Sequence, residues 1–183
     1  MQRPRFPKPY ADFVARLRVP AGFVMLAAFL WWSKPAVDAI LRGLPLSLAG
    51  LGLRAWAAGN LAKNQALATG GPYASVRNPL YLGSLLLAGG LVIGARDWPL
   101  AALFAAVFLL IYLPVIELEE QHLRELFPAY ADYERRVPGL WPRPRFSSGP
   151  GSFEIKLYVK NQEYQALAAY LGALAWMLWK APA

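Results

Sequence analysis

The residues best suited to chemistry form two polar clusters that lie far apart along the chain. The first is in the segment TGGPYASVRNPLYLG, where Tyr73 is followed by Arg77 and Asn78. Asn is a favoured helix N-cap and Pro a favoured first helical residue, so Asn78-Pro79 predicts a helix start. The free backbone N–H groups of that start, with Arg77 beside them, would attract an anion. The alternative, equally compatible with the local sequence, is a capped helix whose arginine reaches the membrane interface.

The second cluster is the acidic pair Glu119 and Glu120. Adjacent residues of one helix point in different directions, so the two carboxylates should face different partners. Two carboxylates at the mouth of an apolar bundle would attract an ammonium or a sulfonium group. The alternative is a solvated acidic turn in which Glu120 pairs with Arg124, four residues later. Aromatic rings can also hold a sulfonium, and the candidates for the same face are Tyr73, Tyr81, Tyr130, Tyr133 and Trp141.

Arg54 is a third candidate because it is the one charge in the apolar segment Leu44 to Leu61. A charge at membrane depth is costly and often functional, so Arg54 could orient the carboxylate of an acceptor molecule. The alternative is a buried ion pair with Glu117, Glu119 or Glu120.

Metal chemistry is not expected. The chain has no cysteine and one histidine, His122, so it offers neither thiolate ligands nor a histidine cluster.

The composition indicates a membrane protein. Hydrophobic residues make up 57% of the 183 residues and charged residues 16%, against roughly 45–50% and about 25% in soluble domains. We therefore predict an all-α, polytopic membrane bundle that forms one domain over residues 1–183. The predicted spans are 19–33, 44–62, 79–95, 98–116 and 163–180, and a cytoplasmic amphipathic helical segment covers 117–137.

Several smaller features refine this bundle. Leu123, Leu126, Tyr130, Tyr133 and Val137 recur at helical spacing and predict one apolar face, which Pro128 could divide into two helices. Small residues that could allow close helix contacts are Gly50, Gly52, Gly90 and Gly94. Residues 147–152 read as a flexible linker, and residues 153–160 alternate like a short strand, although so few residues leave this open.

The formal net charge of +8 is unevenly placed. Basic residues gather before the first span and after the fourth, including Arg3, Arg5, Arg16, Arg18, Arg135, Arg136 and Arg145. This bias predicts a cytoplasmic N-terminus, in the inner membrane if the protein is prokaryotic, with membrane lipids rather than nucleic acid as partners. Trp31 to Pro35 lack a small-residue cleavage pattern, so the first span is interpreted as an anchor and not as a signal peptide.

The order of these pieces resembles a known family. GPYASVRNPLYLG, a hairpin of spans, and ELEEQHLRELFPAYADYERRVPGLWP are together similar to the isoprenylcysteine carboxyl methyltransferase and phospholipid methyltransferase family of membrane enzymes, over roughly residues 50 to 142. The resemblance implies S-adenosylmethionine as methyl donor and a lipid-like acceptor that enters from the bilayer. It implies cofactor binding by Arg77, Asn78, Tyr81, Glu119 and Glu120, surrounded by Tyr73, Tyr130 and Tyr133. Arg54 and Arg77 are the catalytic candidates.

Two positions depart from the family pattern: Asn78 stands in place of a histidine, and Pro128 in place of a frequent glycine. Asparagine cannot carry charge near neutral pH, which excludes a proton-shuttling role at this position. An acceptor that is already a nucleophile, such as an isoprenylcysteine-type carboxylate, needs only to be positioned near the methyl group. The alternatives are a phospholipid N-methyltransferase, an NADPH-dependent reductase of the sterol type, and a non-enzymatic membrane scaffold.

Overall fold

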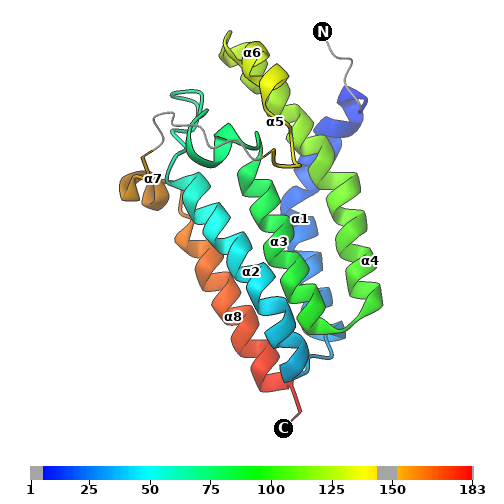
Figure 1. Ribbon diagram of the computed structural model, residues 1–183. Helices are drawn as coiled ribbons and strands as arrows, with labels where there is room; N and C mark the ends of the chain where they lie inside the picture. Colours follow the sequence, from blue (N-terminus) through cyan, green and yellow to red (C-terminus); the bar gives the residue numbers. More distant parts are fainter. Residues whose placement is uncertain (1–5, 144–151, 183) are drawn as a thin grey trace.

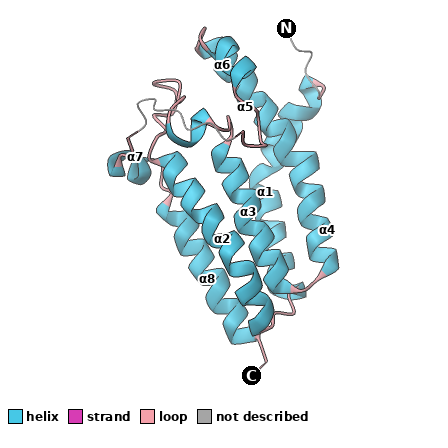
Figure 2. Ribbon diagram, viewed as in Figure 1, coloured by secondary structure: helices cyan, strands magenta, loops and turns pink. Residues whose placement is uncertain are grey.

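The computed structural model describes residues 6–143 and 152–182, and within these ranges it contains helices and loops but no strand (Figure 2). The sequence features at Arg3, Arg5 and Arg145, and residues 147–151 of the expected linker, lie outside the described residues. In chain order the elements are α1 (Lys8–Trp32), α2 (Val37–Ala58), the 3₁₀ turn η1 (Gly71–Ala74), α3 (Pro79–Ala95), α4 (Trp98–Val107), the π-helical turn η2 (Phe108–Tyr112), α5 (Leu113–Leu126), α6 (Tyr130–Arg136), α7 (Ile155–Lys160) and α8 (Tyr164–Lys180).

The long helices run side by side as a bundle, with α6 and α7 at one end and the α3–α4 turn at the other (Figure 1). Among the described residues, two helices are long and apolar enough to cross a membrane: Lys8–Trp32 and the continuous helix Trp98–Leu126. The predicted all-helical bundle is confirmed, and these two helices agree with a membrane protein.

The predicted boundaries hold best for α3, which covers 79–95 as expected. The segments expected at 19–33 and 44–62 are parts of longer or earlier helices, because α1 begins at Lys8 and α2 at Val37. Each helix continues through an internal proline, Pro20 in α1 and Pro45 in α2. Apolar surroundings offer no water to unbonded backbone groups, so the helical state persists across one missing N–H.

The fourth predicted span does not end at residue 116, because the helix continues to Leu126. Its backbone loosens at η2, where the N–H of Leu113 bonds to the carbonyl of Phe108, five residues back. Pro114 follows and has no N–H to offer the carbonyl of Leu110. The hydroxyl of Tyr10 on α1 donates to that carbonyl at 2.7 Å and so ties α1 to this turn.

The expected division at Pro128 is confirmed, since α5 ends at Leu126 and α6 begins at Tyr130. Tyr130, Tyr133 and Val137 are buried together, with Leu123 and Phe127 packed against them. Leu126 is 41% exposed and therefore does not belong to the predicted apolar face.

Residues 153–160, whose structure the sequence left open, contain α7. The segment docks on the end of α2: the N–H of Glu154 bonds to the carbonyl of Gly59 at 2.8 Å. The side-chain amide of Asn161 donates to the carbonyls of Ala58 and Leu61, each at 2.9 Å. The bond to Gly59 satisfies a carbonyl left free at the end of α2, and Asn161 ties the segment to the loop that follows.

Glycines bring α2 and α3 into backbone contact. A methyl group on Gly43 would lie 2.1 Å from the carbonyl oxygen of Gly90, and one on Gly50 would lie 2.4 Å from the nitrogen of Leu87. Gly94 is also packed, against Met177 of α8. The expectation for Gly52 is wrong, since its α-carbon faces open space.

Candidate functional site

The two polar clusters predicted from the sequence meet at the α6 end of the bundle. The segment after α6 runs against the start of α3, where the N–H groups of Arg77 and Asn78 bond to the carbonyls of Pro138 and Gly139 at 2.9 and 3.1 Å. The helix start at Asn78-Pro79 is confirmed, but the Asn78 side chain does not cap α3. Its amide instead donates to Oε1 of Glu120 at 2.8 Å.

Arg77 is neutralised by the protein's own acids. Its Nη2 lies 3.2 Å from Oε2 of Glu120, and its Nη1 lies 2.8 Å from Oε1 of Glu134, an ion pair whose angle falls outside hydrogen-bond geometry. Arg124 bonds to both oxygens of Glu134, at 2.6 and 2.9 Å, and approaches Glu120 at 3.8 Å. The predicted seat for a free anion at Arg77 is therefore wrong, because two carboxylates already occupy it.

Glu134 belongs to this network and was not indicated by the sequence pattern. Helical spacing could have indicated Glu134, because it follows Tyr130 by four residues and so lies next to the predicted apolar face. The hydrogen bond from Arg124, with a further contribution from Arg77, lowers the pKa of Glu134 to about 2. Glu134 therefore stays ionised under physiological conditions.

Glu119 points away from Glu120, as expected for neighbours on one helix. Its Oε1 accepts a hydrogen bond from the Tyr81 hydroxyl at 2.8 Å and faces Nη1 of Arg18 at 3.3 Å. The Arg18 guanidinium also lies over the Tyr81 ring, 5.8 Å from its centroid. Arg18 of α1, which the sequence indicated only as part of the basic N-terminal group, thus helps to place this carboxylate.

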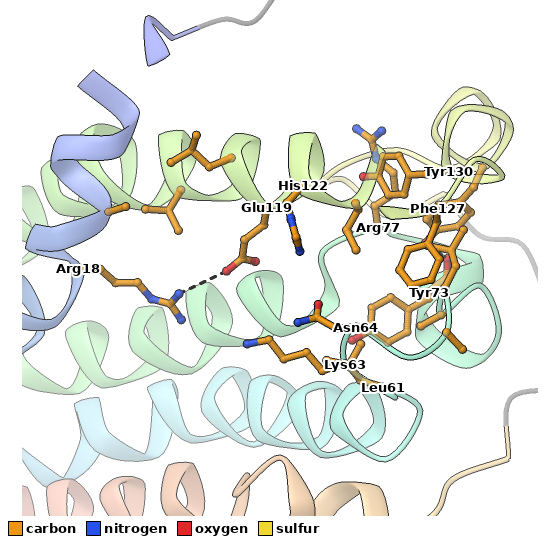
Figure 3. Close-up of a pocket in the computed structure, with 18 residues that line it drawn as sticks. Arg18, Leu61, Lys63, Asn64, Tyr73, Arg77, Glu119, His122, Phe127 and Tyr130 are labelled. Atoms are coloured by element: carbon orange, nitrogen blue, oxygen red, sulfur yellow. Dashed lines mark hydrogen bonds and ion pairs between the residues drawn. The ribbon is translucent and has the colours of Figure 1, made fainter. Parts of the chain in front are cut away.

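A cavity of about 420 Å³ opens where these elements meet (Figure 3). The predicted site residues that line it are Tyr73, Arg77, Glu119, Tyr130 and Tyr133. Asn78, Tyr81 and Glu120 stand one layer behind and hold Arg77 or Glu119 through the bonds described above. The volume falls in the range of small-molecule sites, about 300–1,000 Å³.

Two tyrosine hydroxyls in this lining have no partner. Tyr73 is 6% and Tyr130 1% exposed, and neither hydroxyl makes a hydrogen bond within the described residues. Burial raises the pKa of both phenols above their ordinary range, so both remain protonated donors. A buried polar group without a partner costs about 1–3 kcal/mol. A polar atom placed beside either hydroxyl would relieve this cost.

Tyr133 has a different part in the site. Its hydroxyl donates to the backbone carbonyl of Tyr73 at 2.7 Å, which fixes η1 against α6. Burial also raises the pKa of Tyr133 above its ordinary range. Tyr133 thus supports the Tyr73 side of the cavity.

Further polar residues line the same cavity and were not predicted from sequence: Arg18, Lys63, Asn64 and His122. Lys63 and Asn64 lie in the loop between α2 and η1, and no helical spacing links that loop to the two clusters. His122 follows Glu119 by three residues, so helical spacing could have placed it on the Glu119 side.

Arg54 lies elsewhere, in an ion pair between helices. Its Nε and Nη2 contact the two carboxylate oxygens of Glu163 at 2.5 and 2.9 Å, and its Nη1 bonds to Ser84. The expected acidic partners were Glu117, Glu119 and Glu120, whereas the partner observed in this contact precedes α8. Arg54 does not appear in the cavity lining described above, and this placement gives no support to a role beside an acceptor there.

Comparisons with known proteins found a matching family and similar proteins. A family model described as phospholipid methyltransferase matches residues 45–130. The chain is 38% identical over 149 residues to the cobalt-zinc-cadmium resistance protein CzcN of Cupriavidus metallidurans, which covers 75% of this chain and 67% of that protein. It is 30% identical over 152 residues to the nickel-cobalt-cadmium resistance protein NccN of Alcaligenes xylosoxydans xylosoxydans, covering 75% and 70%.

No solved structure matches the chain. The family match covers most of α2 and all of α3, α4 and α5, and it includes Arg77, Asn78, Glu119 and Glu120. The chain belongs to the phospholipid methyltransferase family, a family of membrane methyltransferases.

Proposed function

We propose that the protein is an S-adenosylmethionine-dependent methyltransferase whose acceptor is a lipophilic, membrane-partitioned molecule. Methylation of an isoprenylcysteine-type carboxylate is the reaction that we favour, and phospholipid N-methylation is the alternative. The observation that carries the proposal is the cavity at the meeting point of the two clusters, with the unpaired, buried hydroxyls of Tyr73 and Tyr130 in its wall.

The lining suits the parts of this cofactor. The hydroxyl of Tyr130 and the unpaired Nε of Arg77 are donors for its ribose or base. The Glu119 carboxylate, whose side chain is 46% exposed, is available to its positive groups. The rings of Tyr73, Phe127, Tyr130 and Tyr133 offer faces for stacking or for the sulfonium.

When bound, S-adenosylmethionine would supply a methyl group whose bond to sulfur breaks, leaving the electron pair on sulfur, as the acceptor oxygen forms its bond to carbon. The chain itself needs only to align the acceptor and exclude water. Val115, Leu118 and Leu123 give the cavity an apolar wall that suits both tasks. A carboxylate acceptor requires no general base, which agrees with an asparagine at position 78.

The orientation in the membrane is part of the proposal. Trp31, Trp98 and Trp179 are 83%, 88% and 76% exposed, and they belong to helix ends opposite α6 and α7 (Figure 1). Exposed tryptophans favour a membrane interface, while the cavity end carries the larger share of Lys and Arg. We infer five spans, with the N-terminus and the cavity on the cytoplasmic side of the inner membrane.

The test is the binding of S-adenosylmethionine to the full chain in detergent, measured by isothermal titration calorimetry. Tyr130→Phe removes an unpaired hydroxyl and keeps the ring, and it is expected to weaken S-adenosylmethionine binding about five- to tenfold, as for the loss of one hydrogen bond. Tyr164→Phe, at an exposed tyrosine of α8, is the matched control. Transfer of a labelled methyl group into a lipid extract identifies the reaction.

The other candidate functions give different results in the same experiment. Binding of NADPH without binding of S-adenosylmethionine would identify a reductase. Binding of neither molecule would leave the scaffold and remove the proposal.

The two curated relatives are named for resistance to metal ions. For this chain we propose that any link to resistance acts through methylation of a membrane component. Growth of cells that carry the wild type or Tyr130→Phe, on cobalt, zinc and cadmium salts, tests that link.

A further inference from the structure

The mouth of the cavity carries polar side chains that the proposed cofactor set does not use. Lys63 and Asn64 come from the loop after α2, and His122 comes from α5. Across residues 6–143 and 152–182, none of the three has a hydrogen bond or ion pair. In Figure 3 their side chains point into the space in front of Glu119.

The charges around this space do not cancel. Arg77 and Arg124 are balanced by Glu120 and Glu134 in the buried network. Arg18 is balanced by Glu119 at 3.3 Å. Lys63 is left with a positive charge that no described acid compensates, so the cavity mouth favours an anion.

A second observation places a donor beside this charge. The hydroxyl of Tyr73 is unpaired, and its residue is 94% buried, since only 6% is exposed. In Figure 3 the Tyr73 hydroxyl points toward Asn64 and Lys63. A protonated phenol, an amide and an ammonium group together form a donor set suited to the oxygens of a carboxylate or phosphate.

The rest of the lining is suited to a hydrocarbon body. Leu61, Leu67 and Ala68 from the same loop, with Leu118 and Ala15, line the cavity next to these donors. Hydrophobic burial of a chain and charge pairing of a headgroup would therefore act on one molecule.

We propose that Lys63, with Asn64 and the Tyr73 hydroxyl, forms a subsite for the oxyanion headgroup, carboxylate or phosphate, of the lipid-like acceptor. This inference rests on the proposed function, because it is the methyltransferase activity that makes the bound lipid the acceptor. S-adenosylmethionine carries a positive sulfur, so its presence would strengthen the preference for an anion. An amine acceptor would leave the reaction as a cation, which the Lys63 charge opposes.

The experiment is equilibrium dialysis of labelled amphiphiles with the full chain in detergent. Oleate and oleyl alcohol form a pair that differs in the charge of the headgroup, and dioleoyl phosphatidate tests a phosphate. Lys63→Met removes the charge and keeps a long side chain, Lys63→Arg keeps the charge, and Lys160→Met alters an exposed lysine of α7 as control.

Lys63→Met is expected to weaken binding of oleate or phosphatidate about tenfold, as for loss of one charge-assisted hydrogen bond. Oleyl alcohol binding should not change, Lys63→Arg should stay near the wild type, and Lys160→Met should have no effect. The anion whose binding falls identifies a carboxylate or a phosphate subsite. The proposal would be overturned if Lys63→Met weakened binding of all three amphiphiles equally, or if it weakened binding of none of them.

The cofactor's own carboxylate is the competing occupant, and calorimetry on the same variants separates it. If Lys63→Met weakens S-adenosylmethionine binding and leaves oleate and phosphatidate unchanged, Lys63 belongs to the cofactor site and the acceptor subsite is refuted. If the wild type binds no S-adenosylmethionine but still discriminates anions through Lys63, the methyltransferase proposal fails while the anion subsite stands.

Discussion

The side-chain amide of Asn78 donates a 2.8 Å hydrogen bond to Oε1 of Glu120, so the residue that opens α3 fixes a carboxylate 42 positions later. The other oxygen of that carboxylate faces Arg77 at 3.2 Å. Asn78 and Glu120 therefore act as one unit that holds Arg77 in the cavity wall. An uncharged amide is sufficient for this work, since it needs only to donate a hydrogen bond.

Asn78→Asp should destabilise the protein, because it replaces the donor with a second carboxylate directed at Glu120. We expect the free energy of unfolding to fall by about 2 kcal/mol or more, measured by thermal unfolding in detergent. Asn78→His keeps a ring N–H donor and should lose less. Equal stability of Asn78→Asp and the wild type would show that the amide is not required to hold Glu120.

Glu134 should make stability fall in acid. Its hydrogen bond with Arg124 lowers its pKa to about 2, whereas a glutamate in the unfolded chain titrates near the ordinary value of about 4.3. A lowered folded-state pKa stabilises the protein above the unfolded value, and this contribution is lost as pH falls from about 4.3 to about 2.

Glu134→Gln should therefore lower the unfolding temperature at pH 7 and flatten its decline between pH 5 and about 3. Thermal unfolding across that pH range measures both effects. Asp132→Asn is the control, because Asp132 is exposed and pairs only loosely with Arg135, at 3.5 Å. If the unfolding temperature of Glu134→Gln depended on pH as it does in the wild type, Glu134 would not be the group responsible for the loss of stability in acid.

Features fixed by local chemistry could be predicted from the sequence. The start of α3 follows from the residues Asn78-Pro79, and Pro128 marks the break between α5 and α6. The divergence of Glu119 and Glu120 follows from helix geometry alone. These predictions needed no knowledge of what packs where.

Partners that are distant in sequence could not be predicted in this way. Arg54 finds Glu163 at a separation of 109 residues, and Arg77 finds Glu134 through the fold of the segment around α6. A charge pattern shows which residues need partners but not which ones the packed helices bring close. For the same reason the sequence indicated an open anion seat at Arg77, whereas among the described residues it is Lys63 that lines the cavity without an acidic partner.

Arg54 should be needed for stability rather than for binding at the cavity. Arg54→Met leaves the largely buried Glu163 carboxylate unpaired, and loss of one partner of a buried pair costs about 3–5 kcal/mol. Arg54→Met/Glu163→Met removes both charges and should recover most of the unfolding temperature. Methyl transfer by a stable double variant would remove Arg54 from the catalytic candidates. Complete loss of methyl transfer in that variant would make Arg54 a catalytic candidate again.

Gly90 should tolerate no side chain. A methyl group there would lie 2.1 Å from Oγ of Ser47 and 2.4 Å from the carbonyl oxygen of Gly43, so α2 and α3 would have to separate. We expect Gly90→Ala to destabilise the bundle by about 1–3 kcal/mol. Gly52→Ala is the matched control in open space, and it should be neutral or stabilising by up to about 1 kcal/mol. Equal unfolding temperatures for the two variants would refute the close contact.

Tyr10 and Pro114 should be energetically coupled, although they lie on different helices. Pro114 cannot donate to the carbonyl of Leu110, and the Tyr10 hydroxyl does so at 2.7 Å. Tyr10→Phe leaves this carbonyl without its donor and should cost about 1 kcal/mol. In a Pro114→Ala background the helix regains its own N–H at that position, so the same substitution should cost less. A double-mutant cycle of unfolding temperatures measures the coupling. We expect the double variant to lose less stability than the sum of the two single variants, because the restored N–H bonds to the carbonyl of Leu110. Additive losses would show instead that Tyr10 acts only through its ring.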